Sequence, residues 1–497
     1  MATKSALLAT SLEALKDIQD REDYLIVRSE ELSRTHLKRL IDNRFLMQII
    51  AGWYIVTDPL SQPGDTTAWY ASFWRFISLY AHYRYDDNWS LSAEQSLSIY
   101  SGVTVVPKQI IIRSKQANNN IITFIGGNSA LALKAEPSQS ITKEKGLNLY
   151  SLEEALIVCA PSMYQLEPLT MRTALSMIKD SADILKILVD TGQTTRAGRL
   201  AGAFRNIGRG DIADTIITTM KKMGYDVRED DPFEERIEVS FAPSPYATRI
   251  RLMWHKMRDT VINRVALPKS NLSKSEIIAQ MEAKYKQDAY HSLSIEGYRI
   301  TEALIERVKD GSWRAENDEA KNALAARGYY QAFQLVKQSV EQSIGAINCG
   351  EIIRKDLQQW HAEMFMPCVE AGIIRPSDVV GYRSHQVYIR NSMHTPLPHE
   401  ALRDAMDTLY TLLEEETEAA VRAILGHFIF TFIHPYMDGN GRIGRFIMNS
   451  MLVTGGYDWL IIPVERRDEY MAALERASVE GDITLFSEFI SSIKDEI

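Results

Sequence analysis

The sequence predicts a mostly α-helical, multidomain protein. In the C-terminal half, apolar residues recur at helical spacing in one segment after another. Nearer the N-terminus, short segments rich in β-branched residues alternate with turn residues. The length of 497 residues suggests about three domains. We therefore expect a winged helix-turn-helix at residues 1–60, an α+β domain at 65–240, a linker at 241–275, and an all-α domain with a small β-hairpin at 276–497.

Composition is that of an ordinary globular protein, with 45% hydrophobic and 24% charged residues. The net charge of −9 argues against a general nucleic-acid binder, although it permits a local basic face. Cys159, Cys349 and Cys368 are widely spaced and odd in number, which suggests a reducing compartment. No apolar run reaches the length of a membrane span. These features predict a cytoplasmic protein without a membrane partner.

Residues 1–60 carry the pattern of a winged helix-turn-helix. Leu12 to Ile18 predicts a first helix, and Ser33 is placed to cap a second helix with Leu37 and Leu40 on one face. The segments on either side of Ala51-Gly52 predict a hairpin wing. Acidic neighbours dilute the positive charge of the second helix, so a solvated face is the alternative to DNA binding. The candidate DNA-binding residues on its other face are Arg34, Thr35, Lys38 and Arg39.

Residues 65–240 combine helices with short strands. Trp69 to Tyr80 predicts an aromatic-rich helix with one face toward a core. Turn residues separate the strand segments and predict a small antiparallel sheet. We expect its strands at Val103–Val106, Gln109–Ile112, Ile121–Phe124 and Ala130–Leu133, and further helices at Met171–Val189 and Asp211–Met223.

Prolines mark the expected linker between the two halves of the chain. Pro243, Pro245 and the polar run Pro268–Ser275 are typical of a joint. Beyond it, apolar periodicity predicts helices at Ile277–Tyr290, Thr301–Val308, Ala320–Lys337, Glu351–Met366, Leu402–Glu415, Ala420–Ile433 and Ile443–Val453.

The stretch from His434 to Arg445 reads HPYMDGNGRIGR and joins the last two of these helices. Its glycines allow a ligand to approach the main chain, and the free N–H groups at the start of a helix form an anion site. Arg442 and Arg445 lie three residues apart and match phosphate oxygens. Asp438 offers a hard oxygen for Mg²⁺, and His434 can take a proton from a hydroxyl. The pattern predicts a site that transfers part of a nucleoside polyphosphate to an alcohol.

This stretch resembles the signature of the Fic family, HPFx(D/E)GNGRxxR, with Tyr436 where phenylalanine is usual. The resemblance implies an all-α Fic core. It also implies transfer of AMP from ATP to a Ser, Thr or Tyr hydroxyl on a target protein or on the protein itself. His434 would be the base in this reaction, and Asp438 would be the Mg²⁺ ligand.

The same resemblance implies how the phosphates are held. Asn440, with Gly439 and Gly441, would form the anion hole for the transferred phosphate. Arg442 and Arg445 would hold the remaining phosphates. ATP and Mg²⁺ are therefore the expected substrate and cofactor.

A second stretch, Ser292 to Gly297, resembles the inhibitory motif of Fic proteins, (S/T)xxxE(G/N). We expect it on a helix near residues 285–298. Glu296 docked on Arg445 would occupy the guanidinium meant for the γ-phosphate of ATP, so that ATP could bind only in an unproductive pose. The alternative is an ordinary helix end, with Glu296 solvated and Gly297 as a C-cap.

Residues 379–391 alternate as a strand would. In Fic proteins a hairpin flap lies before the catalytic helix and holds the target segment as an added strand. An ordinary surface hairpin is the alternative. The expected target-docking residues are Gly381, Tyr382, Arg383, Val387, Tyr388 and Ile389.

The N-terminal half resembles AbiEi-type antitoxins and transcriptional regulators, through its layout and phrases such as Trp89-Ser90-Leu91-Ser92. The leading hypothesis is a self-inhibited protein adenylyltransferase. One alternative is removal of AMP, with Glu296 activating water, or transfer of another phosphate-containing group. The other alternative is a DNA-binding regulator or a toxin–antitoxin fusion. The sequence leaves a homodimer open.

Overall fold

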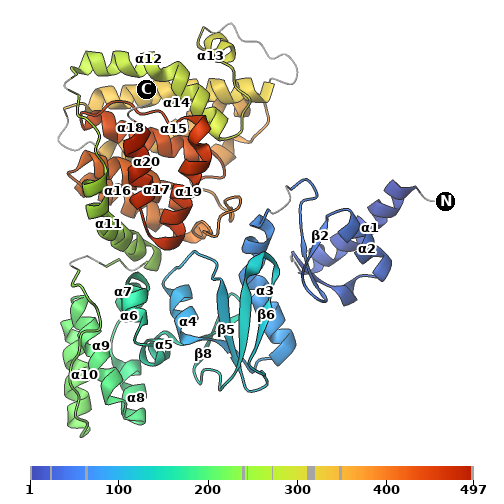
Figure 1. The fold of residues 1–497 in the computed structure, drawn as a ribbon, viewed down its shortest axis with the longest axis vertical. Helices are drawn as coiled ribbons and strands as arrows, with labels where there is room; N and C mark the ends of the chain where they lie inside the picture. The colour runs from blue at the N-terminus through green and yellow to red at the C-terminus, as the bar shows by residue number, and fades with distance from the viewer. Residues whose placement is uncertain are drawn as a thin grey trace. The chain divides into compact units, whose positions relative to one another are not determined.

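The structure, a computed structural model, describes residues 3–22, 25–61, 65–237, 241–242, 244–270, 272–310, 320–345 and 350–493. The chain forms two compact units, Met1–Glu238 with Tyr388–Thr395 and Val239–Val387 with Pro396–Ile497. Figure 1 shows strands in the first unit and helices throughout the second, so the predicted mostly α class is confirmed. Pro243 and Cys349, which are named above, and Asn271 within the predicted polar run lie outside the described residues.

The N-terminal module of the first unit packs two helices on a three-stranded antiparallel sheet of order β1-β3-β2. The predicted cap is present, because Ser33 Oγ accepts a hydrogen bond from His36 N at 3.2 Å. The predicted hairpin is also present, with Gly52 at φ +85° in its turn. Leu15, Leu40 and other apolar side chains bury a small core. The elements are α1 (Lys4–Glu22), β1 (Ile26–Arg28), η1 (Ser29–Glu31), α2 (Arg34–Asp42), β2 (Leu46–Ile50) and β3 (Trp53–Val56).

The predicted small sheet is mixed rather than antiparallel. Its order is β4-β5-β7-β6, and β5 pairs with β7 in parallel, with Ile110 opposite Ala130. Because β6 and β7 form a hairpin that places β7 next to β5, β7 runs in the direction of β5. Helix α3 covers the sheet with buried Trp69, Phe73 and Phe76. The elements are α3 (Thr67–Tyr85), β4 (Ser90–Leu91), α4 (Ala93–Tyr100), β5 (Gln109–Ser114), β6 (Asn120–Thr123), η2 (Ile125–Gly127), β7 (Ser129–Lys134), β8 (Ile141–Glu144) and β9 (Leu147–Tyr150).

Two further predictions in this unit were wrong. The strand expected at Val103–Val106 is absent, and this segment forms only an isolated bridge between Val105 and His394. The helix expected at Met171–Val189 is split, because the polar residues before Ser181 interrupt its apolar face. The helices here are α5 (Leu152–Val158), α6 (Met163–Leu166), α7 (Pro168–Ser176), α8 (Ala182–Thr191), α9 (Thr194–Asn206) and α10 (Gly210–Lys222).

The second unit is a helical assembly around α17 and α18. The expected linker instead contains the long helix α11, which buries Ile250, Trp254 and Val261 along one face. No helix in the described part of the chain is long and apolar enough to cross a bilayer. The elements are α11 (Pro245–Arg264), α12 (Lys274–Ile295), α13 (Glu302–Lys309), α14 (Ala320–Ser343), α15 (Glu351–Glu370), η4 (Pro376–Val379), η5 (His399–Ala401), α16 (Leu402–Glu415), α17 (Ala419–Ile433), α18 (Asn440–Thr454), η6 (Val464–Arg466), α19 (Arg467–Glu480) and α20 (Thr484–Ile493).

Close packing of α14 on α15 generates a prediction. A Cβ atom on Gly328 would lie 1.9 Å from the Met364 carbonyl oxygen. Gly328→Ala should therefore destabilise the unit by about 1–3 kcal/mol, although alanine is normally the better helix former. Thermal unfolding checks this, with Gln342→Ala on the exposed face of α14 as the control. A Gly328→Ala protein at least as stable as wild type would contradict the packing.

Candidate active site

The loop from His434 to Gly439 connects two buried helices and turns sharply at both ends. Helix α17 is apolar nearly all round, as predicted, and ends where His434 takes a left-handed conformation at φ +55°. Gly439 precedes α18 at φ +86°, a conformation that favours glycine. The first helical hydrogen bond of α18 runs from Ile443 N to Gly439 O. The N–H groups before Ile443 therefore have no acceptor within the helix and point toward the loop.

His434 is held in one orientation and one tautomer. Its Nδ1 lies 3.1 Å from the Thr431 carbonyl oxygen. A carbonyl can only accept, so Nδ1 carries the proton and Nε2 has the free lone pair. Burial lowers the pKa of His434 to about 4, which keeps the ring neutral at physiological pH. A neutral imidazole with an available Nε2 is suited to act as a general base.

The side chain of Asn440 bonds to the loop itself. Its side-chain oxygen accepts from Tyr436 N at 3.0 Å, and its amide nitrogen donates to Tyr436 O at 2.8 Å. The side chain is buried and closes the loop on itself. It is therefore directed at the main chain of the loop, and Asn440 can serve an anion only through its backbone N–H.

The side chain of Arg442 is buried, whereas that of Asp438 is largely exposed to solvent. Arg442 is 1% exposed, with its guanidinium 5.4 Å from the Tyr298 ring centroid and 5.1 Å from that of Phe365. It contacts Asp438 through Nη2 at 3.3 Å. The Asp438 side chain is 64% exposed, and its Oδ1 also accepts from Gly439 N. Asp438 thus presents a carboxylate to solvent beside a buried cation.

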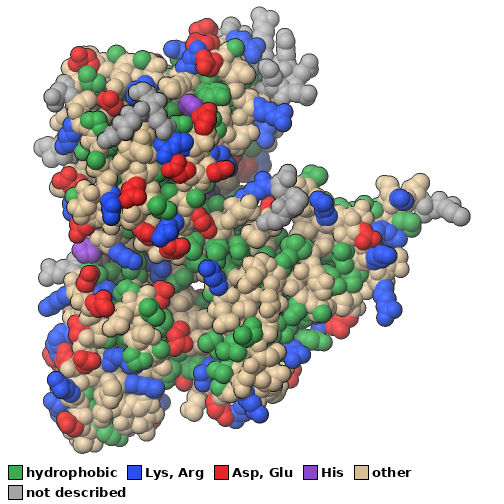
Figure 2. Space-filling model, in the orientation of Figure 1, with side chains coloured by type: hydrophobic (Ala, Val, Ile, Leu, Met, Phe, Trp, Pro, Cys, Tyr) green, Lys and Arg blue, Asp and Glu red, His purple; other side chains and the backbone are tan. Residues whose placement is uncertain are grey.

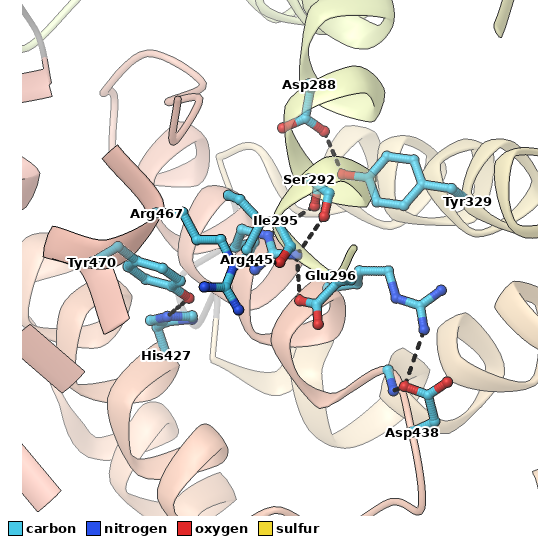
Figure 3. A network of polar contacts seen from close by, with 12 residues as sticks. Asp288, Ser292, Ile295, Glu296, Tyr329, His427, Asp438, Arg445, Arg467 and Tyr470 are labelled. Atoms are coloured by element: carbon cyan, nitrogen blue, oxygen red, sulfur yellow. Dashed lines mark hydrogen bonds and ion pairs between the residues drawn. The ribbon is translucent and has the colours of Figure 1, made fainter. Parts of the chain in front are cut away.

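Arg445 is bound by the helix that carries the second motif (Figure 3). Its Nε donates to Ser292 Oγ at 2.8 Å, and its Nη2 donates to Ser292 O at 2.9 Å and Glu296 Oε1 at 2.8 Å. Arg445 is buried, whereas 26% of the Glu296 side chain is exposed. A Cβ atom on Gly441 would lie 2.3 Å from Glu296 Oε1, so a larger residue there would displace the docked carboxylate. The expected docking of Glu296 on Arg445 is therefore the arrangement seen in this structure.

The positive charges of Arg445 and Arg442 keep the Glu296 carboxyl ionised. Burial raises the pKa of the Glu296 carboxyl, but Arg445 and Arg442 lower it by more. The pKa therefore lies below its ordinary value, and Glu296 is ionised at neutral pH. Gly297 follows at φ +86° and ends the helix, as the alternative interpretation also expected.

Two buried nitrogen atoms near this contact lack partners within the described residues. They are Nε of Arg442 and Nη1 of Arg445. Unpaired donors on buried guanidiniums are costly unless an acceptor arrives. Both arginines, together with the N-terminus of α18, are thus suited to an anion with several oxygens.

The expected target-docking flap contains no strand between residues 380 and 391. Arg383 is buried, and it donates to the carbonyl oxygens of His434 at 2.9 Å and His385 at 2.8 Å, and to that of Leu397. Its backbone N also donates to Pro435 O at 2.9 Å. These carbonyl groups bond to a side chain rather than to a neighbouring strand. Arg383 therefore supports the loop from His434 to Gly439.

The remaining flap residues divide between the two units. Gly381 turns at φ +76°, and the Tyr382 hydroxyl lies 3.0 Å from that of Tyr410. Val387 is half-buried in the second unit, whereas Tyr388 and Ile389 begin the segment that belongs to the first. That segment continues to Thr395 and bonds to strand-like residues of the first unit, with Val106 N donating to Met393 O and Thr395 N to Thr104 O.

Several site residues gave no signal in the sequence. His361 stacks on Tyr436 with ring centroids 3.7 Å apart, and its Nε2 donates to Asp438 O at 3.1 Å. Arg467 donates to Ile295 O at 2.8 Å, at the end of α12. Tyr470 is buried, and its hydroxyl lies 2.8 Å from His427 Nε2. Their positions depend on tertiary packing, which no short motif encodes.

Comparison with known proteins agrees with this geometry. Residues 351–452 match the sequence model described as the Fic/DOC family. The chain therefore contains a Fic domain in its C-terminal half, and the resemblance inferred from residues 434–445 is confirmed.

Relatives match somewhat less than half of the chain. Protein adenylyltransferase Fic of Drosophila willistoni is 28% identical over 237 residues, which is 47% of this chain and 45% of that relative. The protein of the same description from Drosophila virilis is 30% identical over 222 residues, 44% of this chain and 42% of that relative. The chain thus spans less than half the length of these relatives.

Solved structures with Fic domains are also similar. Fic-1 (residues 134–508) from C. elegans has 17% sequence identity and a TM-score of 0.38, and covers 69% of this chain and 88% of that one. A Fic domain containing signaling protein from Bacteroides thetaiotaomicron has 18% identity and a TM-score of 0.36, with 49% and 91% covered.

The departure from the signature at Tyr436 generates a prediction. The Tyr436 side chain is buried, and its hydroxyl has no hydrogen-bond partner among the described residues. Tyr436→Phe should therefore be neutral or stabilising by up to about 1 kcal/mol. Tyr470→Phe is the contrast, because its bonded hydroxyl should cost about 1 kcal/mol when removed. Urea unfolding of both variants measures this, and equal destabilisation would contradict the assignment.

Proposed function

We propose that this protein is a protein adenylyltransferase that moves AMP from ATP to a Ser, Thr or Tyr hydroxyl of a target protein or of itself. The observation that carries this proposal is the arrangement around α18. A neutral His434 with a free Nε2 precedes a helix N-terminus and two buried arginines with unpaired nitrogens. The names of the relatives from Drosophila support the same activity.

The reaction follows from these positions. The hydroxyl oxygen attacks the α-phosphorus, and His434 Nε2 takes its proton. The new O–P bond forms as the bond between the α-phosphorus and the bridging oxygen breaks, and pyrophosphate leaves. The backbone N–H groups of Asn440 and Gly441 would bind the α-phosphate oxygens, and the arginines would bind the others.

Mg²⁺ fits this site through Asp438. The carboxylate is largely exposed and lies beside the anion site. The described residues hold no cluster of three or more acidic, His or Cys ligands, and one carboxylate plus phosphates is a usual Mg²⁺ environment. When bound, Mg²⁺ would neutralise charge on the leaving phosphates.

In this proposal Glu296 inhibits the enzyme. Its carboxylate occupies the Arg445 guanidinium that would otherwise bind the terminal phosphate. An ionised carboxylate also repels a polyphosphate, so both geometry and charge oppose a productive ATP pose. Ser292, which binds the same guanidinium twice, strengthens the contact, and Gly297 ends the inhibitory helix.

Labelling with α-³²P-ATP and Mg²⁺ tests the function. Glu296→Gly should raise incorporation on the order of tenfold, since about 1.4 kcal/mol of lost competition suffices for that. Glu296→Gln, which keeps an acceptor but loses the charge, should fall between wild type and Glu296→Gly. Adding His434→Ala to Glu296→Gly should lower incorporation by about 10²- to 10⁴-fold.

Three results would contradict the proposal. Label that persists in a folded Glu296→Gly/His434→Ala protein would exclude His434 as the base. Release of AMP from a pre-labelled protein that depends on Glu296, without incorporation in any variant, would favour the opposite reaction. Incorporation only from another nucleotide would favour transfer of a different phosphate-containing group.

DNA binding by the N-terminal module is a second candidate function. Arg34, Thr35 and Lys38 are exposed on one side of α2, whereas Arg39 donates to Leu7 O at 2.9 Å and Ser11 Oγ at 2.7 Å and supports α1 instead. Figure 2 shows acidic and basic side chains interspersed on the visible face of this unit, so any DNA contact is local.

Gel-shift titration against salt tests this candidate. Arg34→Ala/Lys38→Ala should weaken binding to duplex DNA and reduce the slope of log K against log salt by about 2. The control is Lys4→Ala/Lys16→Ala, which removes the same charge from exposed positions of α1. Equal effects of the two pairs would indicate non-specific attraction and count against a recognition role for α2.

A further inference from the structure

Helix α12 carries a line of polar side chains at four-residue intervals, Lys284, Asp288, Ser292 and Glu296. Residues four apart lie on the same side of a helix, so these side chains form one stripe about 18 Å long. The sequence motif includes only the last two. The first two are also directed into the second unit, and the proposed reaction gives them no role.

The members of the stripe bond to three different parts of the second unit. Lys284 Nζ donates to Trp459 O at 2.8 Å, in the segment after α18. Asp288 Oδ2 accepts from the Tyr329 hydroxyl of α14 at 2.6 Å. Ser292 and Glu296 both accept from Arg445 of α18. Figure 3 shows Asp288, Ser292 and Glu296 in succession along α12, with Tyr329 and Arg445 reaching toward them.

The bond between Asp288 and Tyr329 is the most enclosed of these contacts. Asp288 is 4% exposed, and Tyr329 is fully buried. Burial raises the pKa of Asp288 to about 6, and the Tyr329 hydroxyl and the Arg445 and Lys284 cations oppose that rise. The carboxylate is therefore mostly ionised at pH 7, and a hydroxyl that donates to a buried carboxylate forms a strong bond.

Directional bonds of this kind constrain a helix in a way that apolar packing does not. Buried Met281, Tyr285 and Leu293 also hold α12, but apolar contacts are non-directional and tolerate small shifts. A shift by one residue moves a helix about 1.5 Å along its axis, which would break a 2.6 Å hydrogen bond. The same shift would carry Glu296 away from Arg445.

We propose that Asp288 and Tyr329 are positioning residues for the inhibitory contact: their hydrogen bond fixes α12 along its axis and so places Glu296 on Arg445. This inference rests on the proposed function, in which the contact inhibits transfer. It assigns regulation to two buried residues outside both motifs. Neither residue touches ATP or the target in this scheme.

The test compares Tyr329→Phe with Tyr285→Phe in α-³²P-ATP labelling. Tyr285 is a matched control, because it is buried in α12 and its hydroxyl has no partner among the described residues. Tyr329→Phe should raise labelling about three- to tenfold. It should have no effect when Glu296→Gly is already present. Tyr285→Phe should leave labelling unchanged in both backgrounds.

Two substitutions of Asp288 separate position from charge. Asp288→Asn keeps an oxygen that can accept from Tyr329 and should stay close to wild type. Asp288→Ala removes the acceptor and should raise labelling as Tyr329→Phe does. An Asp288→Asn protein as active as the Asp288→Ala protein would overturn the positional role. Labelling that falls equally with and without Glu296 would also overturn it, because this indicates general damage to the fold.

Hydrogen–deuterium exchange tests the inference without relying on activity. Amides of residues 292–297 should exchange faster in Tyr329→Phe than in Tyr285→Phe. Equal exchange in the two proteins would overturn the inference, whatever the labelling shows. If Glu296→Gly fails to raise labelling while exchange still differs, the inhibitory part of the proposed function fails and the positioning of α12 stands.

Discussion

The burial of Arg445 is the constraint on which the second unit depends. A guanidinium that is 3% exposed must meet acceptors or an opposite charge, since the cost of removing it from water is otherwise several kcal/mol. Helix α12 supplies both, through Ser292 and Glu296. This requirement ties α12 to α18 across a long stretch of sequence. It also explains Gly441, because the carboxylate that satisfies Arg445 lies where a side chain would be.

In the proposed function, the same constraint gives the site two states. Arg445 can be neutralised by a carboxylate of its own chain or by a phosphate, and both anions would use the same face of the guanidinium. An intramolecular carboxylate needs no binding step, so it is favoured until α12 moves. The affinity for nucleotide and the stability of the α12 contact are therefore linked, and whatever loosens one strengthens the other.

The sequence was sufficient for the local features of the site and insufficient for its tertiary details. Helices α17 and α18 and the loop between them followed from periodicity and fixed spacing, and the α12 motif was expected from its resemblance to the inhibitory motif of Fic proteins. Asn440 could not be assigned, because an amide suits a phosphate as well as a carbonyl, and only the fold shows that it binds Tyr436. Arg383 was predicted to lie on a strand, because an alternating pattern of apolar and polar residues does not show which side chains are buried. Roles that depend on partners distant in sequence leave no local pattern.

The remaining differences in the fold have the same origin. Helix α11 was not predicted, because the prolines near its ends were interpreted as a linker, although Trp254 and Val261 lie on its buried face. The parallel pairing of β5 with β7 depends on which strands become neighbours, and strand segments read singly do not contain that information. The target-docking flap was expected from its place in the chain, but residues 380–391 form no strand, and the Arg383 side chain donates to the carbonyl oxygens of His434 and His385.

The closed loop at Asn440 has a consequence for the energetics of binding. Its two hydrogen bonds to Tyr436, with Arg383 and His361 supporting neighbouring carbonyl groups, hold the loop in shape while Glu296 is docked. A ligand would then lose little affinity to ordering of the loop, because that entropy was already lost when the chain folded. In the proposed function, activation would require only that the C-terminal end of α12 leaves Arg445. The rate of that local opening, rather than the assembly of the loop, would then set how quickly the enzyme responds.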